Sequence, residues 1–260
     1  MRCYVSGWKL GDLVYSIPAV IGGGFDEVIL REDSRDGRMA DQVRVFGPLL
    51  DVVGVRWRFL GGCGAVVADA SWVDGEPKWG RRPKVFGGGR WREANIAEVR
   101  CDGVGVSRDW AGGRWLDVWP RRAARVVFCR SARYRPSVPN VDWRRLIRYA
   151  GGDGVFLGLA AEYQAFKTEF GFLGGHLVVD NFLQVARVLA GADLVVGNQT
   201  GIVAVANGLG VPLILERCER IDNCRFDRGT FWDSSDAFFG GPVDDGDPAV
   251  LGEGECERGD

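Results

Sequence analysis

The strongest constraint on the fold is the segment 192–216, which reads ADLVVGNQTGIVAVANGLGVPLILE. A buried strand at Leu194–Val196, a short helix of small residues and a second buried strand are typical of a parallel βαβ unit. Gly197 permits a sharp turn, and Thr200 and Gly201 open the helix, whose free N–H groups face the crevice above the sheet. Phosphorylated ligands bind there in such folds. The pattern is equally that of a capped helix without a ligand.

A second unit of the same kind is predicted at the N-terminus. Residues 2–6 (RCYVS) read as a strand, residues 7–12 as a Gly-rich turn, and residues 13–20 as a helix. Asp12 is a natural N-cap, because its carboxylate accepts hydrogen bonds from N–H groups of the first helical turn. We therefore expect two Gly-turn half-sites in two α/β halves.

The run ADLVVGNQTG, followed by an Ala-rich helix and Gly-Val-Pro, resembles the nucleotide-sugar-binding motif of heptosyltransferase-like glycosyltransferases of family 9. Members usually read Gly-Asn-Asp-[Ser/Thr]-Gly and then a His. Here Gln199 occupies the Asp position, and no His follows, because the only one is His176. Gly11-Asp12 before an apolar, Pro-containing helix resembles the family's N-terminal motif, in which this Asp is the proposed general base.

The resemblance implies an α/β, GT-B-like fold, with two Rossmann-like halves whose parallel sheets face a central cleft. The acceptor would bind the N-terminal half, 1–122, and the donor the C-terminal half, 123–235. The polar, Arg-rich segment 114–125 is predicted to link them. Residues 236–260 are predicted to form a disordered tail. This tail has eight acidic residues and one basic residue, Arg258, so its charge is −7. Because the whole chain has a net charge of −2, residues 1–235 carry +5. Such a body suits an anionic ligand.

Further elements follow from apolar patterns and turn residues. We expect strands at 27–30, 65–69, 125–129 and 154–158, a helical and then extended stretch at 41–55, a helix after Asp142, and another at 181–190.

The donor site is predicted from polar residues that follow these strands. Arg130 and Arg133 lie in a loop after a strand, and a guanidinium matches two phosphate oxygens at once. Glu162 resembles the family's Glu near the nucleotide, although a carboxylate at a helix N-terminus is an equally good interpretation. The remaining predicted donor-binding residues are Asn198, Gln199, Thr200, Gly201 and Glu216.

The acceptor site is predicted in the segment 78–92, which has six basic residues, no acidic ones, and interleaved aromatic residues. Pro83 and three consecutive Gly residues favour a loop. Such a loop can hold a phosphate backbone and stack on bases or sugars, and it can equally be a solvated loop. The predicted acceptor-binding residues are Lys9, Lys78, Trp79, Arg81, Arg82, Arg90 and Trp91.

The predicted activity is transfer of a sugar from a nucleotide-diphosphate-sugar donor to a hydroxyl acceptor, with inversion and without a metal or other cofactor. Asp12 would take the acceptor proton, or act only as a helix cap. One candidate acceptor is a hydroxymethylated base in DNA. The alternative is a non-catalytic module that sequesters a nucleotide or nucleotide-sugar, which the change at Gln199 motivates.

Other function classes are disfavoured. Seven Cys without a Cys-x-x-Cys pair, and a single His, leave few schemes for a metal. A dinucleotide-dependent oxidoreductase lacks support because no Gly-x-Gly-x-x-Gly follows a strand. The chain shows neither a bilayer-length apolar run nor a signal-peptide pattern, so a cytoplasmic protein is expected. Nothing in the sequence indicates an oligomeric state.

Overall fold

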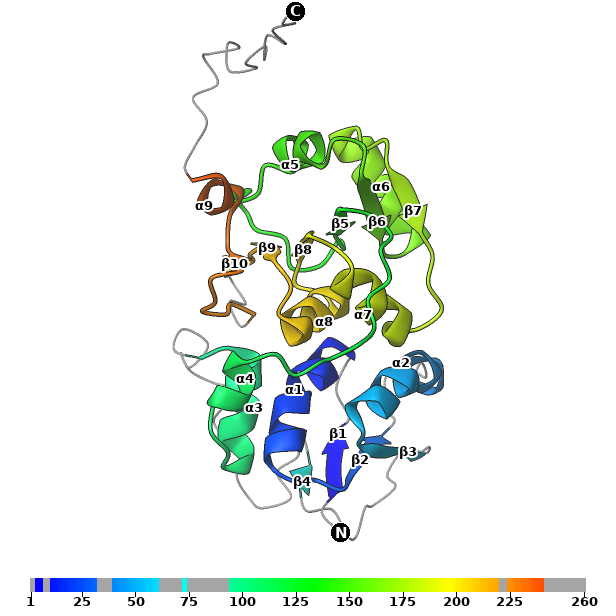
Figure 1. Ribbon diagram of the computed structural model, residues 1–260, viewed down its shortest axis with the longest axis vertical. Coiled ribbons are helices and arrows are strands. Elements are labelled where there is room, and N and C mark those ends of the chain that lie inside the picture. Colours follow the sequence, from blue (N-terminus) through cyan, green and yellow to red (C-terminus); the bar gives the residue numbers. More distant parts are fainter. Residues whose placement is uncertain are drawn as a thin grey trace, which may run out of the picture.

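The computed structural model describes residues 3–6, 10–31, 39–60, 72–73, 94–219 and 224–240. They form two α/β halves, each with a parallel sheet, as predicted (Figure 1). Within the described ranges, no helix combines the length and apolarity that a bilayer span requires.

The N-terminal half has a four-stranded parallel sheet in the order β3-β2-β1-β4. The predicted strands at the N-terminus and at 27–30 are confirmed. The stretch 41–55 is helical as predicted, but the helix continues to Val53 and the extended segment begins only at Arg56, beyond the predicted range. The predicted strand at 65–69 lies outside the described residues. The elements are β1 (Cys3–Ser6), α1 (Leu10–Gly22), β2 (Glu27–Arg31), α2 (Met39–Val53), β3 (Arg56–Leu60), β4 (Trp72–Val73), α3 (Ile96–Val104) and α4 (Asp109–Gly112).

The predicted role of Asp12 as an N-cap is wrong. Helix α1 begins at Leu10, so Asp12 is the third residue of the helix. The apolar spacing of Leu10, Leu13, Val14 and Ile17 already has the helical period, which explains why the helix starts one turn earlier than the Gly-Asp turn suggested. Asp12 nevertheless remains in the first turn, where a carboxylate is favoured by the helix dipole.

The C-terminal half has a six-stranded parallel sheet in the order β10-β9-β8-β5-β6-β7. Counted along this half, the order is that of a Rossmann fold, with its switch point between β5 and β8. The βαβ unit predicted at 192–216 is confirmed as β8, α8 and β9. The elements are β5 (Val126–Cys129), α5 (Trp143–Ala150), β6 (Gly154–Leu157), α6 (Ala160–Phe170), β7 (Gly175–Leu177), α7 (Phe182–Ala190), β8 (Leu194–Asn198), α8 (Gly201–Leu209), β9 (Leu213–Glu216), β10 (Phe231–Trp232) and α9 (Ser235–Phe239).

Side-chain caps open α5, α7 and α8, as a further one at Ser234 opens α9. Asp142 accepts a hydrogen bond from the Arg145 N–H at 2.9 Å, Asn181 from that of Gln184 at 3.0 Å, and Thr200 from that of Val203 at 3.3 Å. Each cap satisfies one of the N–H groups that a first helical turn leaves without an intrahelical partner. The predicted starts of α5, α7 and α8 are therefore confirmed.

The predicted disordered tail starts too early at Asp236. Helix α9 (Ser235–Phe239) includes the first residues of that tail, and its aromatic rings pack against the rest of the C-terminal half. The Phe238 ring packs edge-on against Trp232 at 5.0 Å and against Tyr149 at 5.5 Å. Aromatic burial therefore outweighs the local acidic composition up to this point. Residues 241–260 lie outside the described part of the chain.

The two halves share one hydrophobic core. Helix α1 packs on α8 and α2 packs on α7, so the helices of one half cover those of the other (Figure 1). Phe46 of α2 meets Phe182 of α7 with ring centroids 5.6 Å apart. The Asn207 side chain of α8 donates a hydrogen bond to the Tyr15 hydroxyl of α1 at 3.0 Å. The irregular segment from 113 to 125 connects the halves and contains the domain boundary predicted at 122/123.

Arg228 holds the junction between the halves. Its Nη2 donates to the carbonyls of Ala111 at 2.9 Å and Gly113 at 2.8 Å, at the end of the N-terminal half. Its Nη1 donates to the Asn207 carbonyl of α8 at 2.6 Å. The guanidinium also lies over Trp115, 5.1 Å from the ring centroid. Burial lowers the pKa of Arg228, so the three carbonyls act against a substantial desolvation cost.

We expect Arg228→Ala to lower the free energy of unfolding by about 2–4 kcal/mol, because three carbonyls lose a charged donor and the cation–π contact disappears. Urea denaturation followed by fluorescence measures this loss. Arg225→Ala is the matched control, since the Arg225 side chain is 61% exposed and its ion pair with Asp233 is long, at 3.6 Å. Equal losses in both variants would contradict the role of Arg228.

Candidate functional site

A pocket of about 810 Å³ opens at the carboxyl ends of β5, β6 and β8, at the switch point of the C-terminal sheet. Residues 129–131, 133 and 134 form one wall, residues 157–160 a second, and the start of α8 a third. The N-terminal half also contributes to the lining, through Val45 of α2. The volume lies in the range of small-molecule sites, and the location is where α/β sheets bind ligands.

The start of α8 forms one wall of this pocket, and the free N–H groups and dipole of a helix start favour an anion. Gln199, Thr200 and Gly201, which are among the residues predicted to bind the donor, all line it. The Thr200 hydroxyl caps the helix and also hydrogen-bonds to Cys129, which lies at the end of β5. Burial raises the pKa of the Cys129 thiol to about 12, so it stays neutral at physiological pH. The helix dipole therefore faces the pocket without a competing thiolate.

Asn198 supports the pocket from behind. Its side chain is fully buried. Its Oδ1 accepts a hydrogen bond from the Ser131 N–H at 2.9 Å, and its Nδ2 donates to the carbonyls of Ser131 at 3.0 Å and Arg133 at 2.6 Å. Asn198 thus fixes the loop after β5 and does not line the pocket, which differs from the direct donor contact predicted for it.

Arg130 and Glu216, both predicted to bind the donor, bind each other. The Arg130 Nε and Nη2 donate to the Glu216 carboxylate at 2.8–3.1 Å, and the Trp143 Nε1 donates to it at 2.9 Å. Arg130 is 8% exposed and Glu216 fully buried. Burial lowers the pKa of Arg130, but the bonds to Glu216 and Glu169 outweigh this and leave it above its ordinary value. Removing either partner of such a buried ion pair would leave the other charge buried without compensation, which strongly destabilises a fold.

The guanidinium of Arg130 is enclosed on its other sides as well. It lies over the rings of Trp143 and Phe170, 5.4 and 5.0 Å from their centroids. Its Nη1 donates to Glu169 at 2.8 Å, and Arg135 reaches the same carboxylate oxygen at 3.4 Å. Most of the hydrogen-bonding capacity of Arg130 is therefore taken up inside the protein, although the residue also borders the pocket.

Arg133 and Tyr134 form the exposed rim of the pocket. The Arg133 side chain donates to the Tyr134 hydroxyl at 2.8 Å and lies 4.8 Å from its ring centroid. Tyr134 has a φ of 52°, the only positive φ of a non-glycine residue in the described ranges. A bulky residue in the left-handed region is strained, and such residues gather at ligand sites. Arg133 is thus the predicted arginine that remains open to an anionic ligand.

Glu162 and His176 hold the turn after β6. Glu162 Oε2 accepts a hydrogen bond from the Leu159 N–H at 2.9 Å, so this oxygen serves the helix start, in agreement with one of the two interpretations. His176 Nε2 lies 2.9 Å from the Gly158 carbonyl oxygen, which can only accept, so this nitrogen carries the proton. Both residues line the pocket. Sequence reasoning missed His176, because only the pairing of β6 with β7 brings it there.

The predicted acceptor residues fall outside the part of the chain that the structure describes. They are Lys9, Lys78, Trp79, Arg81, Arg82, Arg90 and Trp91. Helix α1, which carries Asp12 in its first turn, packs against α8, so the base candidate lies on an element at the boundary of the two halves (Figure 1).

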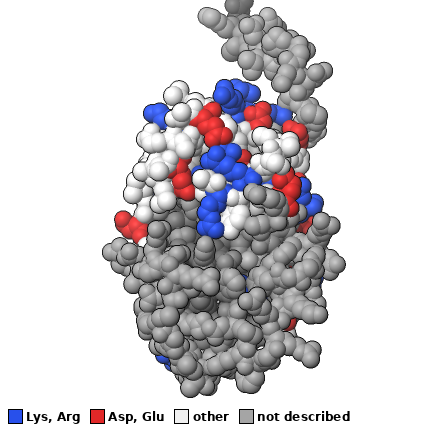
Figure 2. Space-filling model, turned by 180° about the vertical axis from the view of Figure 1, so that it is seen from behind, with Lys and Arg blue, Asp and Glu red and all other residues white. Residues whose placement is uncertain are grey.

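Charge is mixed on the described part of the face that Figure 2 shows. On the face seen in Figure 2, Lys and Arg side chains alternate with Asp and Glu. The described residues contain no group of three or more His, Cys, Asp or Glu side chains placed to hold a metal ion.

Comparison with known proteins shows similarity at the level of the fold. No protein family and no curated protein matches the sequence. The iron-containing dodecameric glycosyltransferase TibC from enterotoxigenic E. coli matches with a TM-score of 0.55 and 14% identity. The TibC heptosyltransferase complex with ADP-D-beta-D-heptose matches with a TM-score of 0.56 and 13% identity. Both matches cover 88% of this chain, which spans only 61% of the TibC chain. E. coli ADP-heptose LPS heptosyltransferase II matches with a TM-score of 0.47 at 13% identity, covering 83% of this chain and 84% of that one. The predicted GT-B-like fold is confirmed.

We expect Glu216→Ala to lower the free energy of unfolding by about 3–5 kcal/mol, because it leaves the Arg130 guanidinium buried without its main partner. Urea denaturation measures the change. Glu169→Ala is the matched control: that carboxylate bonds the same guanidinium from a 42% exposed position, so its loss should cost less than about 1 kcal/mol. A Glu216→Ala variant as stable as the control would refute the structural role of the pair.

Proposed function

We propose that the protein transfers a sugar from a nucleotide-diphosphate-sugar donor to a hydroxyl acceptor. The observation that carries this proposal is the pocket at the β5–β8 switch point, where the start of α8 meets the strained rim of Arg133 and Tyr134. A structure with the same fold has been solved with ADP-D-beta-D-heptose, which supports a nucleotide-sugar as the ligand class.

The donor diphosphate would lie against the N–H groups at the start of α8, with Arg133 at the rim. As the bond between the anomeric carbon and the diphosphate oxygen breaks, negative charge grows on the leaving group. Fixed N–H donors and a guanidinium stabilise this charge without a metal ion. Thr200 and Asn198 would act indirectly, because one caps the helix and the other fixes the loop that carries Arg133.

The acceptor hydroxyl would attack the anomeric carbon from the face opposite the leaving diphosphate, which inverts the configuration. Asp12 would take the hydroxyl proton as the new C–O bond forms. A carboxylate in the first turn of α1 suits this role if its environment raises its basicity through partial desolvation. The products are then the glycosylated acceptor, the nucleoside diphosphate and a protonated Asp12.

We expect Asp12→Asn to reduce turnover by about 10²–10⁴-fold while donor affinity changes little, because the amide cannot accept the proton. Release of nucleoside diphosphate measures turnover, and a thermal shift with nucleotide-sugars measures binding. Asp26→Asn is the control, since Asp26 lies in the connection between the C-terminal end of α1 and the start of β2. Full turnover in Asp12→Asn would exclude this residue as the base.

A non-catalytic module that sequesters nucleotides is the second candidate. Gln199, 7% exposed at the pocket, replaces the carboxylate expected from the resemblance and cannot act as a base. Tight nucleotide binding by the unaltered protein, without turnover for any donor and acceptor pair, would favour this candidate. No thermal shift with any nucleotide-sugar would count against both.

A hydroxymethylated base in DNA is our proposed candidate acceptor. Its support is the basic and aromatic segment 78–92 together with the charge of +5 on residues 1–235. Binding of a duplex should then weaken steeply between about 50 and 200 mM salt, because bound cationic side chains release counterions from the phosphates. Fluorescence anisotropy measures this, and Arg81→Ala/Arg82→Ala should reduce the salt dependence while Arg225→Ala leaves it unchanged. Weak binding that is flat in salt would exclude DNA.

A further inference from the structure

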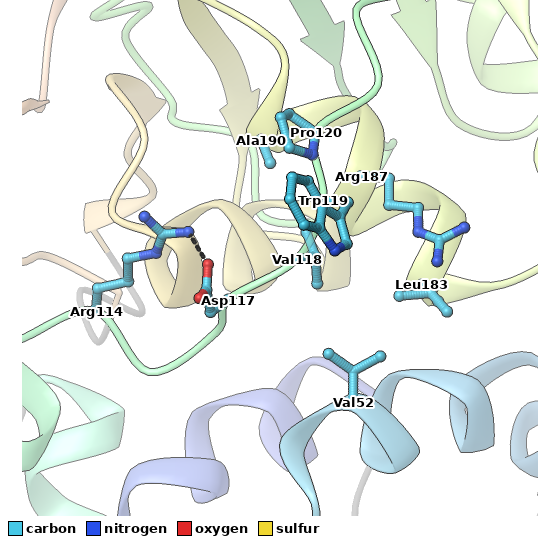
Figure 3. A pocket seen from close by; sticks show the side chains of 9 residues that line it. All are labelled: Val52, Arg114, Asp117, Val118, Trp119, Pro120, Leu183, Arg187 and Ala190. Atoms are coloured by element: carbon cyan, nitrogen blue, oxygen red, sulfur yellow. Dashed lines mark hydrogen bonds and ion pairs between the residues drawn. The ribbon is translucent and has the colours of Figure 1, made fainter.

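A second cavity, of about 630 Å³, lies where the linker crosses between the two halves, and we propose that it binds a pyranose ring of a glycan. Its walls come from the linker, from Val52 near the end of α2, and from Leu183 and Arg187 of α7. Figure 3 shows Trp119 between Arg187 on one side and the pair formed by Arg114 and Asp117 on the other. This site is separate from the donor pocket and does not depend on the proposed function.

Trp119 is the feature that calls for a ligand. Its side chain is 85% exposed, whereas tryptophan is highly buried on average. The backbone around it is fixed, because the Leu116 N–H donates to the Gly208 carbonyl at 2.9 Å and the Arg121 N–H to the Arg187 carbonyl at 2.7 Å. The linker also packs tightly against the end of α7. A Cβ atom added to Gly191 would lie only 2.5 Å from the Arg121 carbonyl oxygen, which is too close for any residue but glycine. The indole is thus presented on a rigid segment, as in binding sites built on aromatic anchors.

The polar groups around the indole select the class of ligand. Asp117, whose side chain is 91% exposed, offers carboxylate oxygens as acceptors, and it is held by Arg114 at 2.5 Å. Arg187 is exposed and offers donors on the opposite side. A sugar hydroxyl both donates and accepts, so a ring of hydroxyls satisfies both kinds of group while its C–H face covers the indole. A purely apolar ligand would make no hydrogen bond to the Asp117 carboxylate or the Arg187 guanidinium, whereas sugar hydroxyls can bond to both.

The cavity lies on the same two helices as the donor pocket. Val45 lines the donor pocket and Val52 lines this cavity, seven residues and therefore about 10 Å further along α2. On α7, Phe182 lines the donor pocket and Arg187 lines the cavity at Trp119. A glycan held at Trp119 would therefore lie alongside the junction of the two halves, at a fixed distance from the donor pocket.

Saturation-transfer NMR on the full chain tests the proposal with named probes: glucose, galactose, mannose and N-acetylglucosamine, each with its linear oligosaccharides. We expect transfer to at least one of these sugars, and Trp119→Ala should weaken its binding about tenfold or more. Trp110→Ala is the matched control, because Trp110 is also exposed, at 47%, but lies in α4 away from the cavity. If an oligosaccharide binds more strongly than its monosaccharide, the ligand of the cavity is a glycan. If the two bind equally, the ligand is a free sugar.

Three results would overturn the proposal. The first is no transfer from the unaltered protein to any probe, and the second is equal transfer from Trp119→Ala. The third is self-association that Trp119→Ala abolishes, measured by sedimentation velocity, which would make the cavity an interface between copies of the chain. Nucleotide binding, followed by thermal shift in the same samples, reports on the donor pocket separately, so that failure of the proposed function is distinguishable from failure of this site.

Discussion

The structure depends on the burial of two polar side chains at the ends of neighbouring strands. Asn198 and Glu216 are register partners on β8 and β9, and both are fully buried. Buried polar groups must be hydrogen-bonded, and a buried carboxylate must also be paired. Asn198 therefore hydrogen-bonds to the backbone of the loop after β5, and Glu216 accepts hydrogen bonds from the Arg130 guanidinium. These bonds fix the segment that forms one wall of the pocket at the β5–β8 switch point.

The same constraint explains why pocket residues fall into two groups. Residues that point into the core, such as Arg130, satisfy the strand ends and hold the wall in place. Residues on the outer side of the loop, Arg133 and Tyr134, line the rim of the pocket, and Tyr134 does so from a strained backbone. A rigid inner layer that supports an exposed outer layer is the arrangement that places ligand-binding groups accurately.

The junction of the halves adds the second part of the site. Helices α1 and α2 cover α8 and α7, and their apolar side chains belong to one core. Arg228 ties the end of α4 to α8 through three carbonyls. Val45 of α2 can therefore line a pocket that belongs mainly to the other half, and the linker can display Trp119 beside α7. Both cavities are consequences of this packing.

By itself, the sequence determined the strand and helix pattern of the βαβ unit at 192–216, the caps at Asp142 and Thr200, and the two-half α/β fold, because periodicity and capping are local properties. Only the tertiary structure decided that Arg130 and Glu216 face each other and that His176 reaches the pocket. It also decided that α9 continues past Asp236, since its rings pack on Tyr149 and Trp232. Such partners are far apart in the chain, and burial makes each of them depend on what the other strands and helices bring to the same place.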